Sequence, residues 1–187
     1  MFWEETMFRK LFGRPEVPDG LGKPSMPTVA FDAKRVTAET RADLLEAIKR
    51  YPDIPADHLA EIHAAAVLAT QSGGDLHAFS SAIIALGLPD VGKRRAGQIA
   101  TQVHGRASAM MTRDRQQSLG IATARWSHSG APCSSLDAPA GQDYLHRGVD
   151  GKTHMVRDGL RVGGITTWPG REPGCKCTSR SIIPGLE

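Results

Sequence analysis

Residues 107–129 read ASAMMTRDRQQSLGIATARWSHS, and at Gly120 within them a helical pattern gives way to a strand-like one. Before the glycine, apolar residues recur every three or four positions, which predicts a helix over 90–118. After it, short apolar stretches at 121–128 and 165–168 are separated by glycine, proline, serine and aspartate, a pattern typical of strands and turns. Together the two patterns predict an α+β fold.

The segment 37–119 is predicted to be a helical region of about four helices, the last being the one just described. Capping residues, prolines and glycines set the bounds of the other three. These bounds are Thr37 to Pro52, Pro55 to Gly73, and Asp75 to Gly87. The remaining segment, 120–187, is predicted to be a small, irregular β-rich domain that buries too little surface to be stable alone.

Residues 1–36 are predicted to form an extended arm. Prolines and glycines alternate through this segment, and neither residue suits a long regular element. The start of the arm carries an apolar cluster, which we expect to bind a groove on a partner protein. The cluster consists of Phe2, Trp3, Phe8, Leu11 and Phe12. The alternative is that these side chains fold back onto their own domain.

All three cysteines, Cys133, Cys175 and Cys177, fall in the β-rich segment. An odd, small number of cysteines does not suggest a disulfide framework, and the spacing of Cys175 and Cys177 disfavours a bridge between them. Two nearby thiolates can instead hold a soft metal ion. With Cys133 and either His146 or His154 they would complete a Cys₃His zinc site, which would staple a domain of this size. The alternative is a tight turn with two half-buried thiols.

Basic residues concentrate between residues 91 and 125, where seven lysines and arginines stand against one acid. Such a stripe can contact nucleic acid or an acidic protein surface. The residues predicted to make this contact are Lys93, Arg94, Arg95, Arg106, Arg113 and Arg115. The alternative is a solvated helix face.

Several classes of protein are excluded by composition and motif. Apolar residues make up 40% and charged residues 23% of the 187 residues, which excludes a wholly disordered or collagen-like chain. No apolar run approaches the roughly 18 residues that span a membrane, and the N-terminus does not resemble a signal peptide. The sequence holds no P-loop, GxGxxG or HExxH motif, and no orienting motif surrounds a Cys133–histidine pair. We therefore expect no enzymatic activity.

The C-terminal half carries five sequence pieces in a fixed order. They are an Arg- and Gln-rich helix ending near Ile121, a strand bearing Trp126, the stretch Leu145–Lys152 with His146 and an Asp-Gly turn, a Pro-Gly stretch at 169–174, and Cys175-Lys176-Cys177. In order and spacing this half, about residues 91–185, resembles the phage Mu F-like head morphogenesis family of minor head proteins. It departs from the family at Asp143, where members usually carry an arginine, and in having Cys133.

The resemblance implies a structural protein of a phage or prophage virion, assembled in the host cytoplasm and present in several copies near the portal. Such proteins assist head assembly, DNA packaging or ejection, so the expected partners are the portal, adjacent head or neck proteins, and packaged DNA. Two other functions stay open from the residues alone. One is a metal-stapled nucleic-acid-binding module, and the other, less favoured, is an enzyme or toxin domain.

Overall fold

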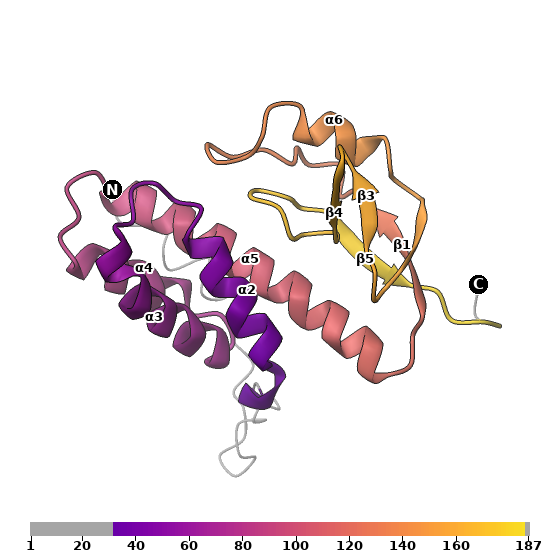
Figure 1. Ribbon diagram of the computed structural model, residues 1–187, viewed down its shortest axis with the longest axis horizontal. Coiled ribbons are helices and arrows are strands. Elements are labelled where there is room, and N and C mark those ends of the chain that lie inside the picture. The colour runs from indigo at the N-terminus through magenta and orange to yellow at the C-terminus, as the bar shows by residue number, and fades with distance from the viewer. Residues whose placement is uncertain (1–31, 186–187) are drawn as a thin grey trace, which may run out of the picture. The chain divides into compact units, whose positions relative to one another are not determined.

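The computed structural model describes residues 32–185, and these fall within one compact unit (Figure 1). Packed helices are followed by a small antiparallel β region, which confirms the predicted α+β class. The predicted boundary at residue 120 marks a change of secondary structure inside this unit. The apolar cluster of the arm, from Phe2 to Phe12, lies outside the described residues.

The helical region contains four α-helices and two short 3₁₀ helices among the described residues. They are η1 (Ala33–Arg35), α2 (Ala38–Ile48), η2 (Ala56–His58), α3 (Leu59–Gln71), α4 (Leu76–Ala85) and α5 (Lys93–Ser118). The predicted cap of α2 is confirmed, because the Thr37 hydroxyl accepts the N–H of Thr40 at 3.1 Å. Helix α5 begins three residues later than predicted, because Val91 closes a turn onto Leu88 and Gly92 is the N-cap.

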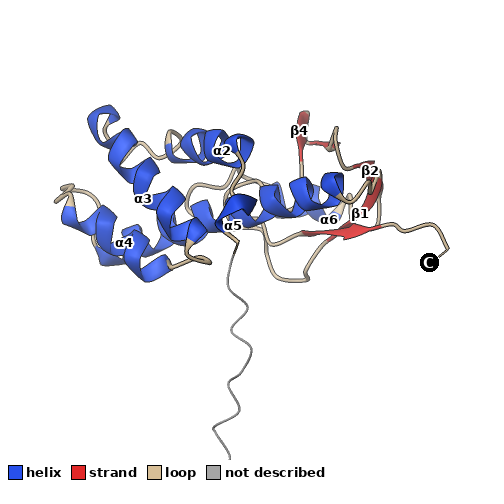
Figure 2. Cartoon of the chain, turned by 90° about the horizontal axis from the view of Figure 1, so that it is seen from below, coloured by secondary structure: helices blue, strands red, loops and turns tan. Residues whose placement is uncertain are grey.

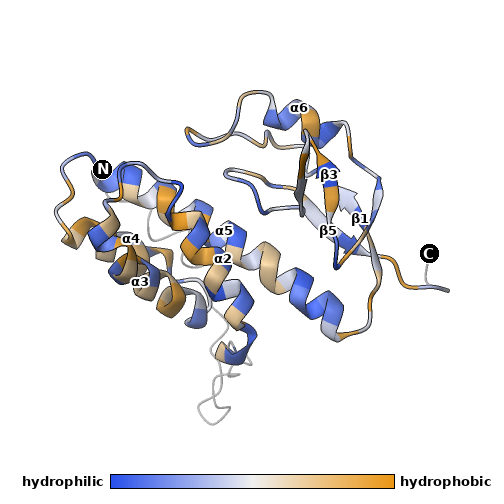
Figure 3. Ribbon diagram, in the orientation of Figure 1, coloured by the Kyte–Doolittle hydropathy of each residue, from blue (hydrophilic) through white to orange (hydrophobic). Residues whose placement is uncertain are grey.

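The apolar faces of α2, α3, α4 and α5 form one core (Figure 3). It is built mainly from aliphatic residues and alanines, with Phe79 and Tyr51 as its aromatic members. The residues least exposed in it are Leu44, Ile48, Ile62, Ala66, Ile83, Ala96, Ile99, Ala100, Val103 and Ala107. Because α5 contacts each of the other three helices, it is the central element of the helical region.

Up to residue 185, where the described part of the chain ends, the β region contains five short strands and one further helix (Figure 2). They are β1 (Thr123–Ser127), α6 (Gln142–Arg147), β2 (Thr153–Met155), β3 (Leu160–Val162), β4 (Ile165–Thr167) and β5 (Thr178–Ser181). Strands β2, β1 and β5 form an antiparallel sheet in that order, and β3 and β4 form a separate hairpin. Both predicted strands, 121–128 and 165–168, therefore exist in shortened form, whereas α6 was not expected in this segment.

Polar contacts hold the β region against the helices. The buried side chain of Gln116 on α5 donates to the Ser181 hydroxyl at 3.0 Å and accepts from the Ser179 hydroxyl at 3.1 Å. Closer to the start of α5, Arg106 donates to Asp43 of α2 at 2.5 and 2.7 Å, and Arg171 donates to the same carboxylate at 2.9 Å. Residues 169–177, which carry two of the cysteines, are thereby tied to the helical core.

No helix in the described range 32–185 combines the length and the apolar character that crossing a membrane requires.

Candidate metal centre

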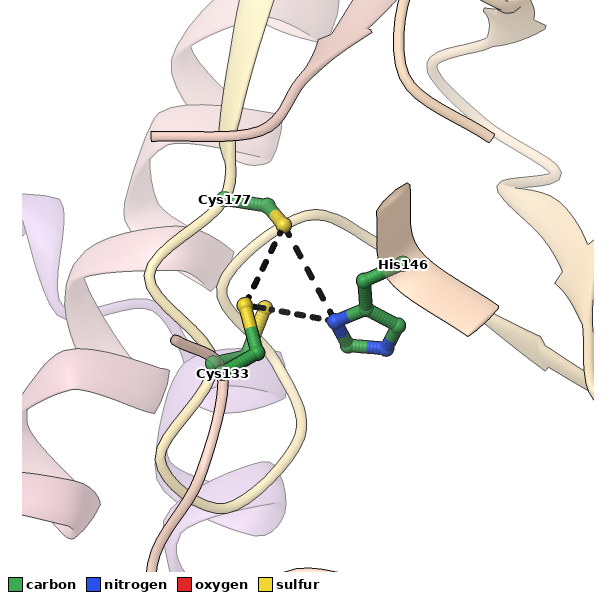
Figure 4. A group of neighbouring side chains, drawn as sticks. Cys133, His146 and Cys177 are labelled. Atoms are coloured by element: carbon green, nitrogen blue, oxygen red, sulfur yellow. Dashed lines mark hydrogen bonds between the residues drawn. The ribbon is translucent and has the colours of Figure 1, made fainter. Parts of the chain in front are cut away.

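Four side chains from three separate segments meet in the β region. Cys133 comes from the loop after β1, His146 from α6, and Cys175 and Cys177 from the loop that precedes β5. One ligand atom from each lies within 4.8 Å of the others, and Figure 4 shows the labelled side chains pointing toward one another. The structure thus brings together the four predicted ligands. His154, the alternative histidine, is not part of the cluster.

The spacing of the ligand atoms suits a tetrahedral metal ion. The Sγ of Cys133 lies 3.5 Å from that of Cys177 and 3.9 Å from that of Cys175. The Nδ1 of His146 lies 3.3 Å from the Sγ of Cys175 and 3.8 Å from that of Cys177. A tetrahedral zinc ion with bonds of about 2.3 Å to sulfur and about 2.0 Å to nitrogen would set its ligand atoms about 3.5–3.8 Å apart. The cluster could therefore hold a metal such as zinc, and its cysteines are free of disulfides.

Backbone N–H groups point at the sulfur atoms, as they do around many metal-bound thiolates. The N–H of Gly170 donates to the Sγ of Cys175 at 3.3 Å, and the N–H of Lys176 donates to the Sγ of Cys133 at 3.4 Å. These bonds favour charged sulfur and fix the direction of each cysteine side chain. Each of the two cysteine-bearing loops therefore holds at least one sulfur atom in a fixed direction.

Gln142 and Gly174 hold the two cysteine-bearing loops together. The Gln142 amide is buried and donates to the carbonyl oxygens of Cys133 at 3.2 Å and Pro173 at 2.8 Å. Gly174 has a φ of 66°, and a Cβ at this position would lie 2.6 Å from the carbonyl oxygen of Ser134. Only glycine allows this close approach of the two backbones.

The thiols of the cluster affect one another's pKa. Hydrogen bonding from Cys177, and secondarily from His146, lowers the pKa of Cys175 to about 4, although burial opposes this. The pKa of Cys177 is raised by the same bond to Cys175 and by burial. Burial also raises the pKa of Cys133. Protein groups alone therefore favour one thiolate, and three thiolates at this place require a cation among them.

The imidazole of His146 is fixed by aromatic packing. Trp126 on β1 is fully buried, and its ring meets the His146 ring edge-to-face with centroids 5.2 Å apart. His146 itself is only 3% exposed. The tryptophan strand thus positions the nitrogen ligand as well as filling the core of the β region.

His128 and Asp143 form an outer layer around Cys133. The Nδ1 of His128 accepts the N–H of Gly130 at 3.0 Å, so in the neutral ring Nε2 carries the proton and donates to Asp143 at 3.1 Å. Asp143 also accepts the N–H of Cys133 at 2.7 Å, and this bond, with those from His128 and Arg147, lowers its pKa to about 2. Because His128 acts as a donor here, it supports the cluster rather than joining it.

Sequence reasoning did not assign His128 and Asp143 to the site. The position of Asp143, three residues before His146, stood out only as a departure from the family pattern. In the structure Asp143 accepts the N–H of Cys133, so the aspartate helps to hold the loop that carries this cysteine.

The predicted basic contact surface needs correction, because three of its six residues serve inside the fold. Arg106 and Arg113 are 4% and 7% exposed, with Arg106 paired to Asp43 and Arg113 to Asp114 and Glu39. Arg95 is largely covered and pairs with both Asp53 and Asp137. Burial and ion pairing leave these three cations unable to face a partner. The exposed members of the set are Lys93, Arg94 and Arg115.

Comparisons of the chain with protein-family models, with curated proteins and with solved structures found no match.

Proposed function

We propose that the protein is a structural component of a phage or prophage virion, a minor head protein near the portal that assists head assembly, DNA packaging or ejection. The main support for the proposal is that sequence segments far apart in the chain meet at one site. The sequence pieces that resemble the Mu F-like family, separated along the chain, supply three of the four cluster ligands and much of their support.

The individual contacts make this convergence specific. In the Trp126 piece and the Asp-Gly turn, the N–H of Gly151 donates to the Trp126 carbonyl and the N–H of Trp126 donates to the Lys152 carbonyl, both at 2.8 Å. The turn residue Asp150 accepts the N–H of His128 at 2.8 Å. The Pro-Gly stretch supplies the N–H of Gly170 to Cys175. Each motif is weak alone, but together these segments form and support one site that could hold a metal ion.

The site is suited to a structural role. A zinc ion held by three cysteines and one histidine has four protein ligands and no coordination position left for a substrate or an activated water. Cys133 is 1% exposed, so its sulfur is not accessible as a nucleophile. The strands it supports are three to five residues long and bury little surface by themselves. When bound, the metal would supply the cross-link that such strands lack.

The test is to purify virions from a host that carries the gene and to measure whether the protein is among their components. The proposal expects particle-bound protein in several copies, together with a defect in filled or infectious particles when the gene is deleted. Complementation with the unaltered gene should restore the titre. Absence of the protein from purified particles, or normal particles from the deletion strain, would contradict the proposal.

A further inference from the structure

The outer face of the three-stranded sheet presents two arginines side by side. Arg125 on β1 lies directly opposite Arg180 on β5 in the antiparallel register, and both are exposed. Within residues 32–185 neither guanidinium takes part in an ion pair, whereas seven other arginines do. The pair therefore carries uncompensated positive charge.

Like charges placed directly across two strands oppose pairing of those strands. Such a pair is tolerated most easily where an anion lies between or over the two groups. Guanidinium groups bind phosphate through two parallel N–H bonds each, which makes phosphate a fitting counter-charge.

The side chains around the arginine pair are hydrogen-bond donors. Strand alternation and register place four hydroxyl residues on the same face, namely Thr123, Ser127, Thr153 and Thr178. This set contains no acidic residue. Arginine, serine and threonine side chains commonly contact phosphate and sugar in protein–DNA interfaces. Met155, opposite Thr123, is an apolar member of the same face, so the donors to a polyanion are the arginine pair and the four hydroxyls.

A hollow of about 440 Å³ includes both arginines in its lining. The other lining residues are Trp126, Ser127, Asp150, Gly151, Ser181, Ile182 and Ile183. The Oδ1 of Asp150 accepts the N–H of His128, and this exposed carboxylate is the one acidic group in the lining, against two arginines. Trp126 is fully buried and offers no surface on which a free base could stack. The hollow thus suits the backbone of a polymer better than a small nucleotide.

We propose that this face binds the phosphodiester backbone of nucleic acid, with Arg125 and Arg180 contacting phosphates and the flanking hydroxyls adding further donors. The placement differs from the basic stripe expected on α5, where Arg106 and Arg113 are buried in ion pairs. Binding at this face does not depend on the virion role.

The experiment measures fluorescence anisotropy of a labelled 20-base-pair DNA duplex of random sequence, titrated with the full-length protein at several NaCl concentrations. The test variant is Arg125→Gln with Arg180→Gln. The matched control is Arg41→Gln with Arg161→Gln, which removes the same charge from two other exposed arginines for which no ion pair is found within residues 32–185. We expect the test variant to lose at least about tenfold in affinity and the control less than about twofold. Because each phosphate contact contributes about 0.9 to the slope of log K against log salt, the test variant should lower that slope by about 1.8.

Equal losses in the two variants would overturn the proposal, since they would reflect net charge alone. Competition by polyglutamate at the same charge concentration as DNA would also overturn it, because the face would then bind acidic polypeptide. If the test variant fails to fold, Arg125→Lys and Arg180→Lys keep the charge and remove the paired N–H bonds. Each should weaken DNA binding without lowering the melting temperature, and unchanged DNA binding in both would refute the assignment.

Discussion

The Nδ1 atom of His146 lies 3.3 Å from the Sγ atom of Cys175, although the two residues are 29 positions apart in the chain. Helix α6 carries the histidine and the loop before β5 carries the cysteine. Gln142, at the start of the same helix, bonds to both cysteine-bearing loops, so the helix sets the distance between its own ligand and theirs. The site is therefore assembled by tertiary contacts rather than by a local motif.

Replacing His146 should abolish metal binding, whereas replacing His154 should not. His146→Asn removes one of four ligands and leaves a buried cysteine cluster without its cation. His154 is equally buried but outside the cluster, so His154→Asn is the matched control. Zinc retained after dialysis should fall well below half an equivalent in the first variant and stay near one in the second. Equal retention in both would mean that His146 is not a ligand.

Replacing Asp43 should destabilise the fold. Burial by itself would raise the pKa of Asp43, but the guanidinium groups of Arg106 and Arg171 outweigh burial and lower it. Asp43→Asn leaves Arg106 buried without its counter-charge, a change that typically costs about 3–5 kcal/mol. Glu46→Gln is the control, because the exposed Glu46–Lys49 pair should contribute little. Urea unfolding of both variants measures the difference, and similar midpoints would contradict the assigned role of Asp43.

The buried imidazole of His154 should make stability depend on pH. Burial lowers its pKa, and both ring nitrogens lack hydrogen-bond partners within the described part of the chain. The unfolded chain therefore takes up a proton near the ordinary pKa of about 6.5, whereas the folded chain does so only at lower pH, so stability falls as pH drops below about 6.5. His154→Leu should flatten the dependence between about pH 5 and 7 without loss at pH 7.5. An unchanged slope in thermal unfolding would exclude His154 as a source of the pH dependence.

Introducing a Cβ at Gly174 should separate the two cysteine-bearing loops. The added atom would meet the Ser134 backbone at 2.6 Å and would also strain a left-handed backbone. Gly164→Ala is the control, because that glycine has a φ of 89° but no neighbouring atom within 4 Å of the added group. Gly174→Ala should lose more than about 1 kcal/mol beyond the control and should hold zinc more weakly. Equal effects would mean that the close approach is unimportant.

Local patterns in the sequence predicted much of the fold. The cap at Thr37, the helix end near Ser118 and the change at Gly120 each depend on neighbouring residues, and the structure confirms them. Helix α6 has only six residues, Gln142–Arg147, which is too short for apolar periodicity to show. Strand β3 is likewise only three residues long, Leu160–Val162, and was not predicted, whereas its partner β4 was.

Longer-range features could not be predicted in the same way. The cysteines and a histidine were identifiable as ligand types, but choosing His146 over His154 needs the fold, because β2 pairs His154 with Ala124, away from the sulfur atoms. The count of basic residues was misleading because the partners of Arg95 and Arg106 lie more than 40 positions away. Only the tertiary structure separates arginines that are paired inside the fold from those that face solvent.

The most direct test of the metal centre is elemental analysis of the purified full-length protein, combined with counting of reactive thiols. The account predicts about one equivalent of zinc per chain and three thiols that react with a thiol reagent only after a chelator removes the metal. Less than about a tenth of an equivalent of metal, with all three thiols freely reactive in the folded protein, would contradict it.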